Sequence, residues 1–354
     1  MAAGISDADA GPGPADAGHT RAPDLTYPIQ AESAGLRLDV FLSQQYPNLS
    51  RSHFKRLVED RQVLLNHQPT KPRCELKAGD AVAVWLPTLT PQEQLIPEAI
   101  PVHILYEDED LLAVNKAAGM VVHPGTGHEE GTLVHALLAH CPRLAIQGSP
   151  LRPGIVHRLD QGTSGAMVVA KSELAYLSLV QQFKAHTVTK EYLALVYGRV
   201  AAAQGQIATL LDRHPKDRKK MAVVERKGRE AVSRWQVEKR WDELTLLLVR
   251  IETGRTHQIR VHLSHLHHPV VGDNVYGGGK RRAKALRTAA LQHLLACVER
   301  QMLHAWRLAL DHPITRQRLH LEAPVPKDFA GLLKQIDLME SGGQVQSPET
   351  REDR

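Results

Sequence analysis

Apolar runs alternate with polar, glycine-containing stretches along most of the chain, and this pattern predicts many short strands. A short run rich in Val, Ile and Leu between polar boundaries is typical of a buried strand. Helical patterns cover residues 133–140 and the segment after Ser172, a residue type favoured as an N-cap. Strands with interspersed helices and no alternating βαβ repeat predict an α+β fold with a mixed or antiparallel sheet. The strand-like runs are residues 102–106, 111–115, 166–170, 192–197, 231–239 and 244–251.

A separate pattern near the N-terminal end predicts a small α/β module. Phe54, Leu57 and Val58 fall at helical spacing and make one apolar face. Ser50 stands where the N-cap of that helix is expected. Two strand-like runs follow the helix, at residues 63–66 and 81–86.

Composition shifts set the predicted boundaries between these parts. The N-terminal stretch is rich in Ala, Gly, Pro and Asp without periodicity, and the C-terminal stretch is polar, so both are predicted to be disordered. Proline-punctuated polar sequence before residue 101 indicates a semi-stiff linker. The predicted divisions are a tail at 1–32, a small domain at 33–87, a linker at 88–100, a large domain at 101–338 and a tail at 339–354.

The charge of the chain is unevenly distributed. The 354 residues carry a net charge of +5, with 42% hydrophobic and 23% charged residues, which is typical of a soluble globular protein. Residues 1–32 hold five acidic residues and one arginine, and residues 340–354 hold four acidic residues and two arginines. The body between them is therefore at +11. A basic body of this size fits a polyanionic partner, although charge alone does not separate nucleic acid from anionic lipid.

Several classes of protein are disfavoured by what the sequence lacks. Cys74, Cys141 and Cys297 are far apart and odd in number, so no disulfide framework or zinc spacing is expected. No run approaches the roughly 18–20 apolar residues that span a bilayer, and no signal-peptide pattern opens the chain. We therefore expect a cytoplasmic protein without a membrane partner. Gly125-Thr-Gly127 lacks the spacing of a nucleotide-binding loop, so no nucleotide cofactor is expected.

A cluster of histidines raises the question of a metal site. His262, His265, His267 and His268 are close together, and the first two are at helical spacing. No acidic residue lies at a spacing that would complete a zinc site. Histidines on a helix surface or facing RNA are the favoured interpretation, and we expect no metal.

The stretch Gly154–Gly165 is the strongest candidate for chemistry. It contains one carboxylate, Asp160, in a polar loop that leads into the apolar run at 166–170. Loops held by a rigid sheet are common places for catalytic groups. Asp is also common in turns, where its side chain caps nearby backbone groups, here those of Thr163 or Ser164. The local pattern favours the turn and leaves catalysis open.

A second stretch, Thr253–His262, carries arginines on a predicted helix. Thr253 or Thr256 is a suitable cap, Arg255 flanks the start, and Arg260 projects away from the apolar face. A guanidinium can bind a carboxylate through two hydrogen bonds and keep it ionised. Spacing alone favours a surface arginine.

Six ordered blocks of the chain resemble the RluA/RluD family of RNA pseudouridine synthases. The resemblance covers roughly residues 33 to 328, with Ala117 standing where the family usually has proline and Gly162 in a variable position. The blocks are Asn115–Gly119 with His123–Gly125, His157–Gly165, Lys190–Ala194, Thr253–His262, Pro269–Asp273 with Tyr276-Gly277, and Leu303–Ala305.

The small module resembles an RNA-binding domain shared by a ribosomal small-subunit protein and tyrosyl-tRNA synthetases. His67 replaces the glycine that is usual in its turn. The resemblance implies phosphate contacts from basic residues, which supply the salt-sensitive part of RNA affinity. A solvated basic face is the alternative. The residues concerned are Arg37, Arg51, Lys55 and Arg56.

The family resemblance implies a large curved central sheet with an active site in a cleft across it. It implies conversion of uridine to pseudouridine by an aspartate nucleophile, Asp160, that acts on the sugar or the base. Arg260 would pair with Asp160, Tyr192 would stack on the target base and help to remove the carbon 5 proton, and Arg158 would hold the extruded nucleotide. The remaining substrate-binding residues implied are His157, Thr163, Arg255, Ile259 and Leu303.

The expected partner is structured RNA, in particular large-subunit ribosomal RNA, which a pre-ribosomal particle would also present. The small module together with residues 123–127 favours this substrate, and transfer RNA is the alternative. We expect a monomer that needs no cofactor, because the isomerisation involves no redox change. A non-catalytic RNA-binding or ribosome-assembly protein is the competing class, and it would not need Asp160, Tyr192 and Arg260 together. A hydrolase triad of Ser164, His157 and Asp160 lacks the expected nucleophile elbow.

Overall fold

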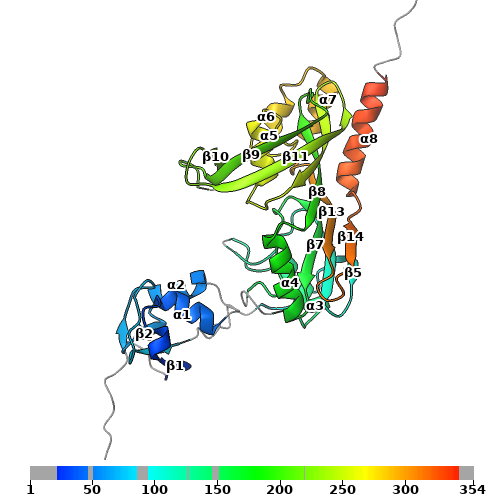
Figure 1. Cartoon of the computed structure of the whole chain (residues 1–354). Coiled ribbons are helices and arrows are strands. Elements are labelled where there is room, and N and C mark those ends of the chain that lie inside the picture. Colours follow the sequence, from blue (N-terminus) through cyan, green and yellow to red (C-terminus); the bar gives the residue numbers. More distant parts are fainter. Residues whose placement is uncertain are drawn as a thin grey trace, which may run out of the picture. The chain divides into compact units, whose positions relative to one another are not determined.

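The computed structural model describes residues 22–46, 51–85, 95–125, 127–145, 151–218 and 220–342, without the side chains of Ser52, His53 and Gly342. The chain divides into two compact units, residues 1–94 with 147–149 and residues 95–146 with 150–354 (Figure 1). The predicted cap Ser50, most of the predicted linker and parts of both predicted tails lie outside the described residues.

The N-terminal unit is a small α/β fold. Its four strands are ordered β1-β4-β2-β3, and all of their pairings are antiparallel. Two helices cover the sheet with a core that contains Phe41, Leu42, Phe54 and Leu57. The predicted helix and both predicted strands are confirmed. The elements are β1 (Leu25–Pro28), η1 (Ala31–Ser33), α1 (Leu38–Gln45), α2 (Arg51–Glu59), β2 (Val63–Leu65), β3 (Gln68–Pro69) and β4 (Ala81–Val84).

The prediction of a disordered tail over residues 1–32 is wrong for its last part. Leu25 and Thr26 pair with Val84 and Ala83, so β1 forms an edge of the small sheet. Ile29, just after the strand, is buried in the core of the unit. A four-residue edge strand with one half-buried face gives only a weak hydrophobic pattern. The neighbouring stretch rich in Ala, Gly, Pro and Asp made this pattern harder to recognise.

The C-terminal unit is built on one ten-stranded sheet. Its order is β10-β9-β11-β12-β8-β13-β7-β6-β5, with β14 paired to β13. Within the described residues every pairing is antiparallel except that of β7 with β13. A mixed sheet in an α+β fold was predicted and is confirmed. The strands are β5 (His103–Glu107), β6 (Leu111–Lys116), β7 (Ser164–Ala170), β8 (Thr189–Tyr197), β9 (Gln204–Arg213), β10 (Met221–Val224), β11 (Arg229–Arg240), β12 (Leu244–Ile251), β13 (Leu303–Asp311) and β14 (Arg318–Glu322).

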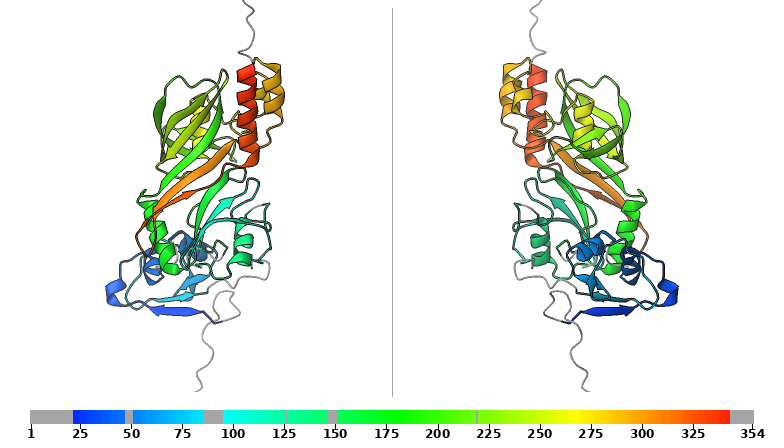
Figure 2. Two further views of the ribbon diagram at one scale, coloured as in Figure 1. Left: turned by 90° about the vertical axis from the view of Figure 1, so that its right-hand side faces the viewer. Right: turned by 90° about the vertical axis from the view of Figure 1, so that its left-hand side faces the viewer.

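Helices cover the sheet at several points (Figure 2). The buried side chains of this unit form separate cores. The capping prediction is confirmed at α4, where Ser172 Oγ accepts a hydrogen bond from the Ala175 N–H at 3.2 Å. The central core contains Tyr192, Ile259 and Leu303 and so lies directly against the candidate site. The helices are α3 (Leu133–His140), α4 (Glu173–Lys184), α5 (Gln258–His265), α6 (Lys280–Ala283), α7 (Ala289–Ala296) and α8 (Lys327–Gly342).

The last helix extends further than the sequence pattern predicted. A disordered tail was expected from residue 339, but α8 continues to Gly342 because its buried face docks on the large unit. Phe329, Leu332 and Ile336 of α8 pack in one core with Leu291 and Leu295 of α7. Across the described ranges, no helix has the length and apolar character needed to cross a membrane.

Candidate active site

Asp160 lies in a loop whose backbone is tightly bonded just before β7. The Thr163 N–H donates to the Asp160 carbonyl at 3.0 Å, and the Gly119 N–H donates to the Gln161 carbonyl at 2.8 Å. Lys116, which is 1% exposed, reaches the same Gln161 carbonyl with Nζ at 3.2 Å. The carboxylate itself caps neither Thr163 nor Ser164 in the hydrogen bonds of the described loop. The turn interpretation therefore fits the backbone of this loop and not the side chain of Asp160.

The carboxylate of Asp160 pairs with Arg260, which comes from α5. Arg260 Nη1 lies 2.9 Å from Asp160 Oδ2, and the Asp160 side chain is 21% exposed. The other edge of the guanidinium makes two bonds to Asp273, Nε to Oδ2 at 2.7 Å and Nη2 to Oδ1 at 3.0 Å. Burial opposes the charge of Arg260, but the hydrogen bonds and charge of Asp273 and the charge of Asp160 outweigh it, so the pKa of Arg260 is raised.

His257 lies on the other side of the same carboxylate. Its Nε2 atom is 3.9 Å from Asp160 Oδ1, and its Nδ1 atom is 2.8 Å from the hydroxyl of Tyr276. That hydroxyl also accepts a hydrogen bond from the Met221 N–H at 2.8 Å. Burial lowers the pKa of His257, and the charge of Asp160 acts in the opposite direction. The ring is therefore neutral near pH 7 and faces the carboxylate.

Two cavities meet at Asp160. One of about 90 Å³ has Tyr192, Ile259 and Leu303 among its walls. Burial, assisted by the charge of Asp160, raises the pKa of Tyr192, so its phenol stays protonated. The other cavity, of about 520 Å³, lies on the side of His123 and Gln161. Seven of the predicted residues line the smaller cavity together with Asp160 and His257: Arg158, Thr163, Tyr192, Arg255, Ile259, Arg260 and Leu303.

Arg158 and Arg255, which both line the smaller cavity, differ in how firmly the protein holds their side chains. Arg158 is exposed and lines both cavities, and its Nη1 atom lies 3.4 Å from Nε2 of His123. Arg255 is tied back by a hydrogen bond from its Nε to the Glu230 carbonyl at 2.9 Å. An exposed guanidinium at the rim is suited to contact an entering polyanion, because its contacts in the free protein are weak.

His157 is a predicted substrate-binding residue that the structure does not bring to the cavity. Its ring stacks on Phe183 at 4.6 Å, and its Nε2 atom accepts a hydrogen bond from the Val168 N–H at 3.0 Å. Burial lowers the pKa of His157 to about 3. The side chain therefore supports the packing of β7 against α4, and we do not retain it as a substrate-binding residue.

The predicted caps of α5 are also not used. His257, with φ of 56°, is the N-cap residue, and Thr253 Oγ1 instead donates to Gln258 Oε1 at 2.7 Å. The left-handed backbone at His257 turns the chain so that α5 begins beside Asp160. Among the described residues, no group of three or more His, Cys, Asp or Glu side chains is placed to hold a metal ion. His262 is bonded to the hydroxyls of Ser233 and Thr209.

In the small unit the predicted RNA-contact residues are all engaged with acidic side chains. Arg37 and Arg51 both pair with Asp39 of α1, at 2.8 and 3.1 Å, and the pair with Arg51 joins α1 to α2. Lys55 pairs with Glu59 and Arg56 with Asp60, at 3.6 and 3.5 Å on the exposed face of α2. Such exposed pairs are weak, so Lys55 and Arg56 are available to RNA, whereas Arg37 and Arg51 have a structural role as well.

Sequence reasoning gave no role to four residues that shape this site. Asp273, Tyr276 and Lys116 stood in the blocks of the family resemblance, and His257 stood inside a block as well. Nothing in their spacing linked them to Asp160, because the contacts join segments that are far apart in the chain. Asp273, for example, reaches Asp160 only through the guanidinium of Arg260.

Family models match a part of each of the two units. Residues 110–265 match the family described as RNA pseudouridylate synthase, and residues 36–82 match the S4 domain. An uncharacterized RNA pseudouridine synthase of Synechocystis is 45% identical over 302 residues, 84% of this chain and 88% of that protein. The ribosomal large subunit pseudouridine synthase D of Xanthomonas campestris is 42% identical over 308 residues, 87% and 91% of the two chains. The solved structure of human RNA pseudouridylate synthase domain containing 4 is 25% identical, with a TM-score of 0.51 over 66% of this chain and 93% of that chain.

Proposed function

The chain belongs to the family of RNA pseudouridine synthases, and we propose that it isomerises uridine in large-subunit ribosomal RNA with Asp160 as the nucleophile. The proposal depends on one observation above all. A single carboxylate, held by Arg260 at 2.9 Å, lies where two cavities meet. A guanidinium in this position keeps the carboxylate ionised, and an ionised carboxylate is the form that attacks carbon.

The reaction requires the bond between N1 of uracil and C1′ of ribose to break and a bond between C5 and C1′ to form. We propose that Asp160 bonds to C1′ as uracil leaves with the electron pair of the N1 bond. The detached base then turns, C5 displaces the carboxylate from C1′, C5 loses its proton, and N1 gains one. Atoms and charge balance without a cofactor, and the product is an isomer of the substrate.

The walls of the smaller cavity support this sequence of steps. Tyr192, Ile259 and Leu303 present one aromatic and two aliphatic surfaces, which suit a flat base that has left its stack. Arg158 at the rim is placed to hold the extruded nucleotide through its phosphate. The phenol of Tyr192 remains protonated, so its proposed part is stacking on the base and hydrogen-bond donation.

Two features support ribosomal RNA as the substrate. The small unit matches the S4 domain, which fits contact with RNA outside the cavity. The relative from Xanthomonas campestris, 42% identical, is named for the large ribosomal subunit. We further propose that one copy of the chain suffices, because Asp160, Arg260 and the walls of the smaller cavity all belong to the C-terminal unit, and that it acts in the cytoplasm, where its three free cysteines stay reduced.

The decisive experiment replaces Asp160 by Asn. This variant keeps the shape of the side chain but removes the nucleophile, so we expect no pseudouridine to form while RNA binding and the melting temperature stay close to those of the wild type. Asp212→Asn, an exposed carboxylate on β9, is the matched control and should remain active. Turnover by Asp160→Asn at the wild-type rate would end the proposal.

The substrate class is tested separately from the chemistry. Pseudouridines should be mapped by carbodiimide-stop sequencing of ribosomal and transfer RNA from cells with and without this protein, complemented with wild-type protein or Asp160→Asn. Loss of sites in large-subunit ribosomal RNA that only the wild type restores is the expected result. Loss confined to transfer RNA would replace ribosomal RNA by transfer RNA as the substrate.

A further inference from the structure

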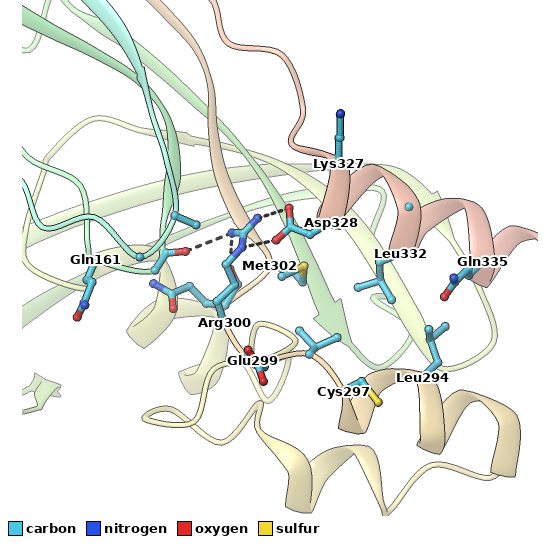
Figure 3. Close-up of a pocket in the computed structure, with 16 residues that line it drawn as sticks. Gln161, Leu294, Cys297, Glu299, Arg300, Met302, Lys327, Asp328, Leu332 and Gln335 are labelled. Carbon is cyan, nitrogen blue, oxygen red and sulfur yellow. Dashed lines mark hydrogen bonds and ion pairs between the residues drawn. The ribbon is translucent and has the colours of Figure 1, made fainter. Parts of the chain in front are cut away.

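Arg300 lies between the loop that carries Asp160 and the first turn of α8 (Figure 3). Its Nε and Nη2 atoms donate to the two carboxylate oxygens of Asp328, at 2.6 and 2.9 Å. Its Nη1 atom donates to the Gly162 carbonyl and to the Gln301 carbonyl, both at 3.2 Å. One guanidinium therefore connects a helix of the C-terminal end with a carbonyl two residues after Asp160.

In the loop from Asp160 to Thr163, each residue after Asp160 accepts a hydrogen bond from a donor outside the loop. Gln161 accepts from Gly119 and Lys116, and Gly162 accepts from Arg300. The next residue along the chain from Arg300 continues this pattern, since Gln301 Nε2 donates to Thr163 Oγ1 at 3.2 Å. A Cβ atom on Gly162 would lie 2.4 Å from Gln301 Oε1, so this segment passes very close to the loop.

We propose that Arg300 is a positioning residue of the isomerisation. Oriented by Asp328, it holds the Gly162 carbonyl and thereby fixes the loop that aims the Asp160 carboxylate. The inference rests on the proposed role of Asp160. It assigns Arg300 no contact with the reacting atoms.

The surroundings of Arg300 separate this role from a general contribution to stability. The Arg300 side chain is 14% exposed and that of Asp328 is 54% exposed, so solvent reaches the carboxylate and limits the free energy of the ion pair. The N-terminal part of α8 is held by the buried side chains of Phe329 and Leu332, independently of the pair. Arg300, Gly162 and Asp328 also line a cavity of about 860 Å³. A shorter side chain at position 300 therefore borders this cavity, and water can fill the space that the guanidinium leaves.

The test compares Arg300→Met, which keeps the aliphatic part of the side chain but has no donor, with Arg300→Lys, which keeps one charged donor. Arg307→Met is the control. Arg307 lies on β13, away from the loop, and this variant also removes an arginine–carboxylate pair, here with Glu322 of β14. Four quantities are measured for each variant: the single-turnover rate at saturating RNA, the RNA dissociation constant, the melting temperature and the amide hydrogen exchange of residues 160–163.

Arg300→Met should lower the single-turnover rate by about tenfold to a hundredfold, as expected for a misplaced reacting group. The dissociation constant and the melting temperature should stay near the wild-type values, and amide exchange at Thr163 should become faster. Arg300→Lys should recover part of the rate. Asp328→Asn should add little to Arg300→Met, because Asp328 acts through the same guanidinium.

Three results would overturn the inference: a wild-type rate for Arg300→Met, a loss confined to RNA affinity, or an equal loss in Arg307→Met. Parallel measurement of Asp160→Asn separates the two proposals. If that variant is inactive and Arg300→Met is fully active, the positioning role fails and the proposed nucleophile stands. If Asp160→Asn is active, the proposed function itself fails.

Discussion

Arg260 lies between Asp160 and Asp273 and binds both, with Nη1 2.9 Å from Asp160 Oδ2 and Nε 2.7 Å from Asp273 Oδ2. The two carboxylates differ in exposure, since Asp273 is fully buried and the Asp160 side chain is 21% exposed. The buried partner receives two hydrogen bonds from the guanidinium and the exposed one receives one. Asp273 therefore orients Arg260, and Arg260 leaves the second oxygen of Asp160 without a bond to the guanidinium, 3.9 Å from Nε2 of His257.

Replacing Asp273 by Asn should harm both stability and catalysis. Removal of one charge of a buried pair destabilises a protein by about 3–5 kcal/mol, and the freed guanidinium would no longer present a fixed edge to Asp160. We expect a lower denaturant midpoint and a single-turnover rate reduced by about tenfold or more. Asp311→Asn, which breaks the exposed pair with Arg318, is the control and should change neither quantity much. An active, fully stable Asp273→Asn would contradict the orienting role.

The phenol of Tyr192 should not ionise in the ordinary range for tyrosine. Burial and the negative charge of Asp160 both raise its pKa above the ordinary value of about 10. Spectrophotometric titration of the wild type minus Tyr192→Phe should show no tyrosinate band below pH 10. A band from this residue at lower pH would mean that Tyr192 can serve as a base after all.

Acid should destabilise the large unit through buried neutral histidines. Burial lowers the pKa of His157 to about 3 and that of His262 to about 4, whereas the unfolded chain binds protons near pH 6.5. Above pH 6.5 neither state is protonated and full stability is present. As the pH falls below 6.5 the unfolded state alone binds a proton, so each group costs about 1.4 kcal/mol per pH unit until its folded pKa is reached.

The measurement is the denaturant midpoint of the wild type and His157→Gln between pH 7 and pH 4.5. Glutamine can still accept the Val168 N–H but does not titrate, so the acid-induced loss should be smaller in this variant. His320→Gln, an exposed histidine on β14, should follow the wild type. Identical pH profiles for the wild type and His157→Gln would exclude this origin of acid sensitivity.

Gly165, at the junction of β7 and β13, should tolerate no side chain. Its φ is +123°, and a Cβ atom there would lie 2.2 Å from the carbonyl oxygen of Ala305. Gly165→Ala should destabilise by at least about 1–3 kcal/mol, the cost of a strained backbone residue, as measured by denaturant unfolding. Gly331→Ala on α8 meets open space and should be neutral or stabilising. A wild-type midpoint for Gly165→Ala would contradict the close packing of these two strands.

Local sequence patterns were sufficient to predict the strands that consist of a continuous, buried apolar run. The run at 166–170 lies within β7, all of whose residues are buried, and the run at 244–251 coincides with β12. The edge strand β1 was missed because only one of its faces is partly buried and it lies in a segment of disorder-like composition. The start of α5 was misplaced because its turn uses a left-handed His257 and no side-chain cap.

The site was predictable only as far as motif blocks could be recognised. The pairing of Arg260 with Asp160 joins positions 100 residues apart, and no periodicity encodes such a contact. The direction of His157 was also hidden, because adjacent residues of one motif can point to different layers. Its ring turns towards Phe183 of α4, whereas Arg158 turns towards the cavity.

Backbone carbonyls of the loop at Asp160 accept hydrogen bonds within the protein, and this bears on the energetics of RNA binding. Lys116, Gly119, Thr163 and Arg300 already occupy its carbonyls in the free protein. For the proposed nucleophile this loop geometry is thus preorganised, and little conformational entropy remains to be lost there when substrate arrives. The binding energy of the polynucleotide is then available for unstacking and extruding the uridine, the step that the nucleic acid itself resists.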